Sequence, residues 1–129
     1  METISILIVD DDNTTRELLR SILNSMQFKK IYTATDGDQA ISQFNEIKPD
    51  LIFLDIEMPV KDGFETMKEM LATNPDQYIA IVSSHSTMDY VKRAIENGAK
   101  GFIVKPYTPA KVKDIVVKYL RGLKTNEQG

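Results

Sequence analysis

The 129-residue chain has no cysteine and only one histidine. Without cysteine there can be no disulfide, thiolate metal site or thiol nucleophile, which fits a reducing compartment. Long apolar runs are also missing: the run from Ile4 to Val9 is too short for a signal peptide or a membrane span, and the opening Met1-Glu2-Thr3 carries no basic region. We therefore expect a cytoplasmic protein that does not insert into membranes.

The sequence has no concentration of positive charge. Its formal net charge is −3, and lysine and arginine are scattered along the chain. Nucleic-acid binding depends on basic residues that neutralise backbone phosphates, so direct nucleic-acid binding is disfavoured. The composition, 42% hydrophobic and 27% charged, is typical of a globular protein of one domain.

Five short β-branched runs alternate with five segments of helical period. The runs are Ile4–Val9, Lys30–Ala34, Leu51–Leu54, Tyr78–Val82 and Gly101–Val104. In the segments that follow them, apolar residues recur at intervals of three and four, as at Val112, Val116 and Tyr119. Runs such as Ile6–Val9 are apolar without alternation, which is typical of strands covered on both faces. The pattern predicts an α/β fold, a five-stranded parallel sheet with helices on both faces.

Capping and turn residues lie at the expected junctions. Asp12 or Asn13 is predicted to cap the first helix, and Asp36-Gly37 to open the second. Asn97-Gly98 is predicted to close the fourth helix and Thr108-Pro109 to open the fifth. Beyond residue 121 the sequence becomes polar, so we expect one domain over residues 1–121 and a frayed polar tail over residues 122–129.

Polar residues follow four of the predicted strands, and ligand sites of open α/β sheets lie at the carboxyl ends of strands. They are Asp10, Asp11 and Asp12 after the first strand, Asp55 after the third, Ser83 and Ser84 after the fourth, and Lys105 after the fifth. Carboxylates gathered at one edge repel one another unless a cation lies among them. An oxygen-rich set favours Mg²⁺, or Mn²⁺, over zinc. It also suits phosphoryl transfer to Asp55, with Lys105 and Ser83 holding phosphoryl oxygens.

Four segments, in matching order and spacing, resemble the receiver domains of two-component response regulators of the single-domain, CheY-like kind. They are Val9-Asp10-Asp11, Pro49 to Pro59 with Asp62-Gly63, Ile81-Val82-Ser83, and Gly98 to Tyr107. The likeness runs from Ile4 to about Leu120, nearly the whole chain. It implies a flavodoxin-like (βα)5 fold with strand order 2-1-3-4-5 and a cis peptide bond between Lys105 and Pro106.

The resemblance also implies a role for each site residue. The implied roles are Mg²⁺ coordination by Asp10, Asp11, Asp55 and the backbone carbonyl of Glu57, phosphoryl acceptance by Asp55, a basic contact by Lys105, and switching by Ser83 and Phe102. The phosphoryl donor would be a histidine kinase or a phosphotransfer protein. The output would be altered binding of a protein target through the face of the fourth helix, fifth strand and fifth helix. Such a domain assists only its own phosphorylation and dephosphorylation and is not an enzyme for an external metabolite.

Two other functions compete with this interpretation. A small phosphatase of the haloacid dehalogenase kind would want Asp-x-Asp after the first strand, which Asp10-Asp11-Asp12 fits only incidentally, and the chain has no room for a cap domain. A pure interaction module would never be phosphorylated.

For Phe102 an alternative is also open: the side chain could equally be an ordinary residue of the hydrophobic core and not a switch.

The residues that flank the predicted phosphoryl site depart from the usual family pattern. Ser84 stands where the family often has alanine, His85 follows it without an assigned role, and Glu57 lies two residues after the acceptor. These positions leave the lifetime of the phosphorylated state open. The sequence likewise leaves open the kinase, the target, the process and the oligomeric state.

Overall fold

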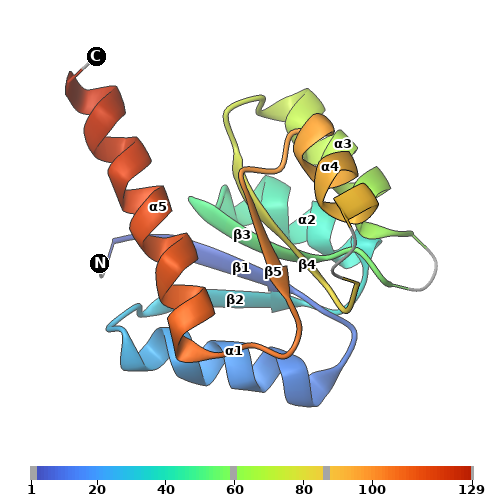
Figure 1. The fold of residues 1–129 in the computed structure, drawn as a ribbon, viewed down its shortest axis with the longest axis horizontal. Coiled ribbons are helices and arrows are strands. Elements are labelled where there is room, and N and C mark those ends of the chain that lie inside the picture. The colour runs from blue at the N-terminus through green and yellow to red at the C-terminus, as the bar shows by residue number, and fades with distance from the viewer. Residues whose placement is uncertain (1–2, 59–60, 86–87, 129) are drawn as a thin grey trace.

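The computed structural model describes residues 3–58, 61–85 and 88–128, with only the backbone for residues 124–128. Pro59 of the receiver-like segments and Gly129 of the predicted tail lie outside the described residues. The described chain forms one sheet of five parallel strands in the order β2-β1-β3-β4-β5, which confirms the predicted topology (Figure 1). The strands are β1 (Ser5–Val9), β2 (Lys30–Ala34), β3 (Leu51–Asp55), β4 (Tyr78–Ser83) and β5 (Gly101–Val104).

Two strands extend one residue beyond the apolar runs that predicted them. In β3 the ladder continues to Asp55, which pairs with Val82, and in β4 it continues to Ser83, which pairs with Val104. Backbone hydrogen bonding therefore reaches past the last apolar side chain. The consequence is that two of the predicted site residues are held by the sheet itself.

Five helices cover the two faces of the sheet. They are α1 (Asn13–Ser25), α2 (Gly37–Ile47), α3 (Gly63–Thr73), α4 (Met88–Glu96) and α5 (Pro109–Gln128). Helices α1 and α5 lie on one face, and α2, α3 and α4 on the other (Figure 1). Each face has its own buried cluster, so successive residues of β1 alternate between them: Ile6 and Ile8 join the first cluster, and Leu7 and Val9 the second. This explains why the run is apolar without alternation.

The predicted helix starts are confirmed by side-chain caps. Asp12, rather than Asn13, caps α1 by accepting a hydrogen bond from the backbone N–H of Thr15 at 2.9 Å. Asp36 caps α2, and Thr108 Oγ1 accepts from the N–H of Lys111 at the start of α5. These contacts satisfy backbone donors that have no partner inside the helix.

Gly98 follows α4 with φ of 104°, the left-handed conformation predicted for it. A Cβ at this position would lie 2.5 Å from Leu71 Cδ1, so both conformation and space favour glycine. The peptide bond between Lys105 and Pro106 is cis, as the family resemblance implied.

Helix α5 continues to Gln128, past residue 121 where the polar tail was predicted to begin, and the fraying of that tail stays a prediction. Residues 122–128 contain one glycine and no proline, and most of them are compatible with a helix. A single interior glycine costs a helix only about 1 kcal/mol, which does not end it. In Figure 1 the last turns of α5 project beyond the sheet. None of the described helices is long and apolar enough to cross a membrane.

Candidate phosphorylation and metal site

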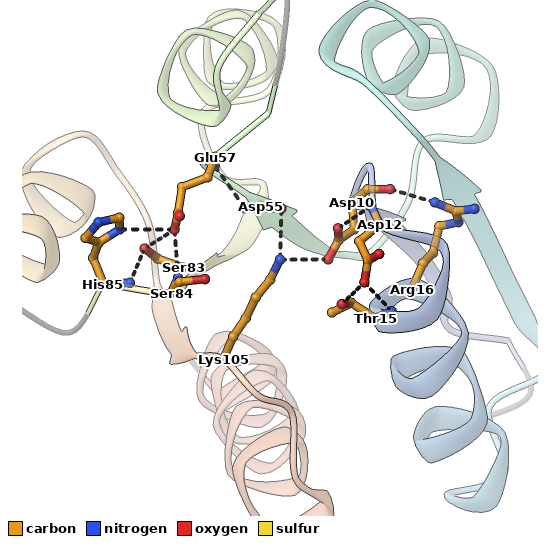
Figure 2. Close-up of polar contacts among 10 residues, drawn as sticks. All are labelled: Asp10, Asp12, Thr15, Arg16, Asp55, Glu57, Ser83, Ser84, His85 and Lys105. Atoms are coloured by element: carbon orange, nitrogen blue, oxygen red, sulfur yellow. Dashed lines mark hydrogen bonds and ion pairs between the residues drawn. The ribbon is translucent and has the colours of Figure 1, made fainter.

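The predicted site residues come together at the carboxyl edge of the sheet. Asp55 and Ser83 are the last residues of β3 and β4, while Asp10 directly follows β1 and Lys105 directly follows β5. Figure 2 shows Asp10, Asp55 and Lys105 converging between the ends of these strands. The sequence pattern predicted this grouping, because parallel strands all end at the same edge of the sheet. Residues as far apart in the sequence as Asp10 and Lys105, which are separated by 95 positions, therefore lie together.

Three carboxylates form a compact acidic cluster. Asp10, Asp11 and Asp55 each offer an oxygen, and these oxygens lie within 4.8 Å of one another. Asp10 and Asp55 have exposed fractions of 0% and 1%, whereas Asp11 is exposed. Two buried carboxylates with a third at the opening give a cation a binding site that is accessible from solvent on one side.

Lys105 connects the two buried carboxylates. Its Nζ lies 3.0 Å from Asp55 Oδ2, to which it donates a hydrogen bond, and 3.2 Å from Asp10 Oδ2. Burial lowers the pKa of Lys105, but the hydrogen bond and charge of Asp55, reinforced by Asp10, outweigh this effect and leave the pKa raised. The lysine is therefore held charged inside the site, not solvated at the surface.

Burial raises the pKa of Asp55 from 3.8 to about 6. The Glu57 N–H, which donates to Asp55 Oδ1 at 2.9 Å, and the Lys105 ammonium both oppose this rise, while the charge of Asp10 adds to it. Desolvation dominates because the ionised carboxylate has lost its water on almost every side. At neutral pH the group is still mostly ionised.

The second oxygen of Asp10 is the best test of whether a cation fits. Asp10 Oδ1 accepts a hydrogen bond from the N–H of Asp12 at 2.9 Å, whereas the buried Oδ2 has no hydrogen-bond partner among the described residues. Lys105 is close enough to attract this oxygen, although the pair does not form an aligned hydrogen bond. An oxygen that is buried, charged and incompletely satisfied suits a hard divalent cation.

Gly63 at the start of α3 brings the helix close to the end of β3. A Cβ at Gly63 would lie 2.5 Å from both the backbone oxygen of Asp55 and Cα of Ile56. The Gly63 N–H also donates to the carbonyl of Ile56 at 3.2 Å. Only glycine permits this approach, which explains the glycine of the Asp62-Gly63 pair in the receiver-like segments.

A second polar group surrounds Ser83. Its Oγ donates to Glu57 Oε1 at 2.6 Å, and the N–H of Ser84 donates to the same oxygen at 2.7 Å (Figure 2). His85 contributes its backbone N–H to Ser83 Oγ at 2.9 Å and places Nδ1 3.4 Å from Glu57 Oε1. Burial raises the pKa of Glu57, but the hydrogen bonds from Ser83, Ser84 and His85 outweigh it and lower the pKa overall.

Comparison with known proteins assigns the family. Residues 6–117 match the family model described as the response regulator receiver domain. The chain belongs to the receiver domain family. Over 113 residues it is 35% identical to a chemotaxis protein CheY of Thermotoga maritima, a match that covers 88% of this chain and 94% of that protein. Receiver domains are signalling domains that are phosphorylated on aspartate in two-component systems and bind Mg²⁺ at an acidic pocket.

Two further relatives place the receiver domain in different settings. The chain superimposes with a TM-score of 0.87 and 33% identity on a chain of the CheX-CheY-BeF3-Mg²⁺ complex from Borrelia burgdorferi, covering 91% of this chain and 89% of that one. It is 38% identical over 127 residues to a protein-glutamate methylesterase/protein-glutamine glutaminase of Clostridium acetobutylicum, covering 94% of this chain but only 37% of that enzyme. The likeness to the enzyme is thus confined to a part of it.

The remaining receiver residues differ in how clearly the structure places them. Phe102 lies in β5 beside Ile81, is half-buried and packs against the core cluster under α2, α3 and α4. This position fits both a core residue and a switch, so the role of Phe102 as a switch stays a prediction. His85 stacks on Tyr90 with ring centroids 4.7 Å apart, a contact that the sequence did not suggest.

Tyr107 was quoted in the sequence only as part of a segment. Its buried hydroxyl has no hydrogen-bond partner in the described part of the chain. Burial, together with the charges of Asp10 and Asp55, raises its pKa. Its position two residues after Lys105 is the only sequence signal that could have drawn attention to it.

Proposed function

We propose that this chain is a single-domain response regulator that accepts a phosphoryl group on Asp55. The observation that carries the proposal is the contact of one buried lysine with two buried carboxylates: Lys105 Nζ lies 3.0 Å from Asp55 and 3.2 Å from Asp10. Charges of this kind are costly to bury, and a cluster of perturbed groups at a strand edge is a candidate for a functional site.

Asp55 is the nucleophile in the proposed reaction. One of its carboxylate oxygens forms a bond to phosphorus while the bond from phosphorus to the donor group breaks. The Glu57 N–H fixes Oδ1 and Lys105 holds Oδ2, so the carboxylate is oriented before a donor arrives. Because the Lys105 ammonium is already beside Asp55, it can stabilise the incoming phosphoryl oxygens with little rearrangement.

Asp10, Asp11 and Asp55 would hold Mg²⁺, with the backbone carbonyl of Glu57 as a further ligand. Mn²⁺ has the same preference for oxygen ligands. When bound, the ion would offset the negative charge of the carboxylates and of the phosphoryl oxygens. Asp10 contributes the buried, incompletely satisfied oxygen, and Asp11 contributes an exposed carboxylate that is accessible to an arriving ion.

The proposed partners are a phosphoryl donor, either a histidine kinase or a phosphotransfer protein, and a downstream protein target. We place target binding on the face formed by α4, β5 and α5. β5 is an edge strand of the sheet, with α4 and α5 on opposite sides of it. Met88 and Ile95 of α4 are 82% and 61% exposed, which supplies apolar contact area beside the edge. The similar chain from Borrelia burgdorferi belongs to a complex of CheX and CheY with BeF3 and Mg²⁺, which supports a protein partner for this fold.

The haloacid dehalogenase alternative would need the second aspartate of an Asp-x-Asp pair to act on the substrate. Here that residue is Asp12, and its carboxylate accepts hydrogen bonds from both the N–H and the hydroxyl of Thr15. These hydrogen bonds lower the pKa of Asp12 and commit it to capping α1. The geometry therefore favours acceptance of a phosphoryl group over phosphatase turnover.

Incubation with a small phosphodonor and Mg²⁺, followed by intact mass measurement, tests the proposal. Wild type should gain one phosphoryl group and Asp55→Asn none. Asp76→Asn, at an exposed aspartate remote from the acidic cluster in sequence, is the matched control and should behave as wild type. Incorporation into Asp55→Asn at the wild-type rate would refute the acceptor assignment. Steady phosphate release from many substrates would indicate a phosphatase, and no reaction a pure interaction module.

A further inference from the structure

The single hydroxyl proton of Ser83 is already donated in a hydrogen bond. Ser83 Oγ donates it to Glu57 Oε1 at 2.6 Å and accepts a hydrogen bond from the N–H of His85 at 2.9 Å. A serine hydroxyl has one proton and can donate it to one acceptor at a time. For Ser83 to donate to a phosphoryl group on Asp55, the hydrogen bond to Glu57 must first break.

The Glu57 carboxylate accepts hydrogen bonds from donors that could otherwise bind the oxygens of a phosphoryl group. The same carboxylate oxygen accepts from Ser83 Oγ and from the N–H of Ser84, both at the end of β4 (Figure 2). Hydrogen bonds to an ionised acceptor are shorter and stronger than those between neutral groups. The carboxylate is therefore a strong competitor for these donors.

We propose that Glu57 is a positioning residue, which holds the Ser83 hydroxyl in the unphosphorylated domain and must release it when Asp55 is phosphorylated. The inference rests on the proposed function, because it assigns a role within the response of that same site. It concerns the Glu57 side chain, whereas the expected metal contact of Glu57 is made by its backbone carbonyl.

The two partners differ in their freedom to move. Ser83 is fully buried, whereas 33% of the Glu57 side chain is exposed, so the carboxylate can turn into water while the serine stays in the sheet. The Glu57 N–H is fixed on Asp55 Oδ1 at 2.9 Å, which keeps the backbone in place. A phosphoryl group on Asp55 would add negative charge two residues from Glu57, which disfavours the Glu57 carboxylate there, and would offer Ser83 another acceptor. Both effects displace the Glu57 side chain, so Glu57 opposes the switch.

Titration with beryllofluoride in the presence of Mg²⁺ tests this role. The readout is the apparent dissociation constant from the backbone amide chemical shifts of Ser83 and Ser84. Glu57→Ala should bind the mimic at least about fivefold more tightly than wild type, the low end of ordinary allosteric couplings. Glu57→Gln should fall between them, because a neutral amide oxygen still accepts the hydroxyl proton but less strongly. Glu65→Gln, which removes a charge from an exposed glutamate of α3, is the control and should match wild type.

The same substitutions in a Ser83→Ala background separate the contact from simple charge repulsion. If Glu57 acts by holding the hydroxyl, Glu57→Ala should give no gain once the hydroxyl is absent. An equal gain in that background would overturn the inference and leave only repulsion between anions. Unchanged or weaker binding by Glu57→Ala in the presence of Ser83 would also overturn it. A wild-type protein with no response, or an equal response from Asp55→Asn, would instead refute the proposed function.

Discussion

Replacing Asp55 by asparagine should stabilise the metal-free domain at neutral pH. The folded protein raises the pKa of Asp55 from 3.8 to about 6, chiefly through burial. Since one pKa unit corresponds to about 1.4 kcal/mol, keeping this carboxylate ionised costs the folded state up to about 3 kcal/mol. Asparagine is nearly isosteric, retains an oxygen for the Glu57 N–H and carries no charge. We expect a gain of about 1–3 kcal/mol in the free energy of unfolding, or roughly 3–5 °C in Tm per kcal/mol for a domain of this size.

The pH dependence of that gain identifies its cause. A folded-state pKa above the unfolded value means that the folded protein binds the proton more tightly. The favourable contribution of Asp55 is therefore complete below about pH 4 and is lost as the pH rises through about 6. Consequently, the stability difference between Asp55→Asn and wild type should be small near pH 4 and largest above about pH 7. Comparing the two proteins at each pH cancels the other titrating groups.

Urea denaturation between pH 4 and 8, in the presence of a chelator, measures this difference. Asp76→Asn is the matched control, because surface substitutions usually change stability by no more than about 0.5 kcal/mol. Saturating Mg²⁺ should narrow the gap, since it stabilises wild type more than the variant that has lost one carboxylate ligand. An Asp55→Asn protein that is no more stable than wild type above pH 7, or a difference that does not change with pH, would refute the argument from desolvation.

Four further predictions concern the site, the packing beneath it and helix α5. Asp11→Ala should abolish the increase in Tm that Mg²⁺ gives wild type, and an unchanged increase in thermal-shift measurements would contradict the metal assignment. Ser83→Ala should still be phosphorylated on Asp55 by intact mass but should lose most of the chemical-shift response across Phe102 and α4 to beryllofluoride; a response equal to wild type would contradict the switch. Gly63→Ala should destabilise the domain by about 1–3 kcal/mol, because its Cβ would lie 2.5 Å from backbone atoms. Gly122→Ala, where a Cβ would have nothing within 4 Å, should instead be neutral or stabilise by up to about 1 kcal/mol in the same denaturation assay.

The sequence by itself determined the order of the elements and predicted which polar residues gather at the carboxyl edge of the sheet. The apolar runs and helical periods are local signals, and strands buried on both faces give the strongest of them, as Ile6–Val9 shows. All strands of a parallel sheet end at the same edge, so the positions of the apolar runs were enough to predict that Asp10, Asp55 and Lys105 lie close together. Capping residues such as Asp36 were equally readable, since a cap acts within three residues of its own position.

Only the tertiary structure decided which of these groups are buried and what they touch. The pKa of Asp55 depends on desolvation by the whole fold, which no local pattern encodes. The hydrogen bond from Ser83 to Glu57 joins residues 26 positions apart and depends on the direction of a side chain, which strand periodicity does not specify. The end of α5 could not be located from the sequence for a similar reason: polar residues indicate contact with water, and a helix that projects from the domain can be as polar as a loop. The ends of the strands and the periodicity of the helices follow from the local sequence. Burial and side-chain contacts exist only after distant segments have packed together.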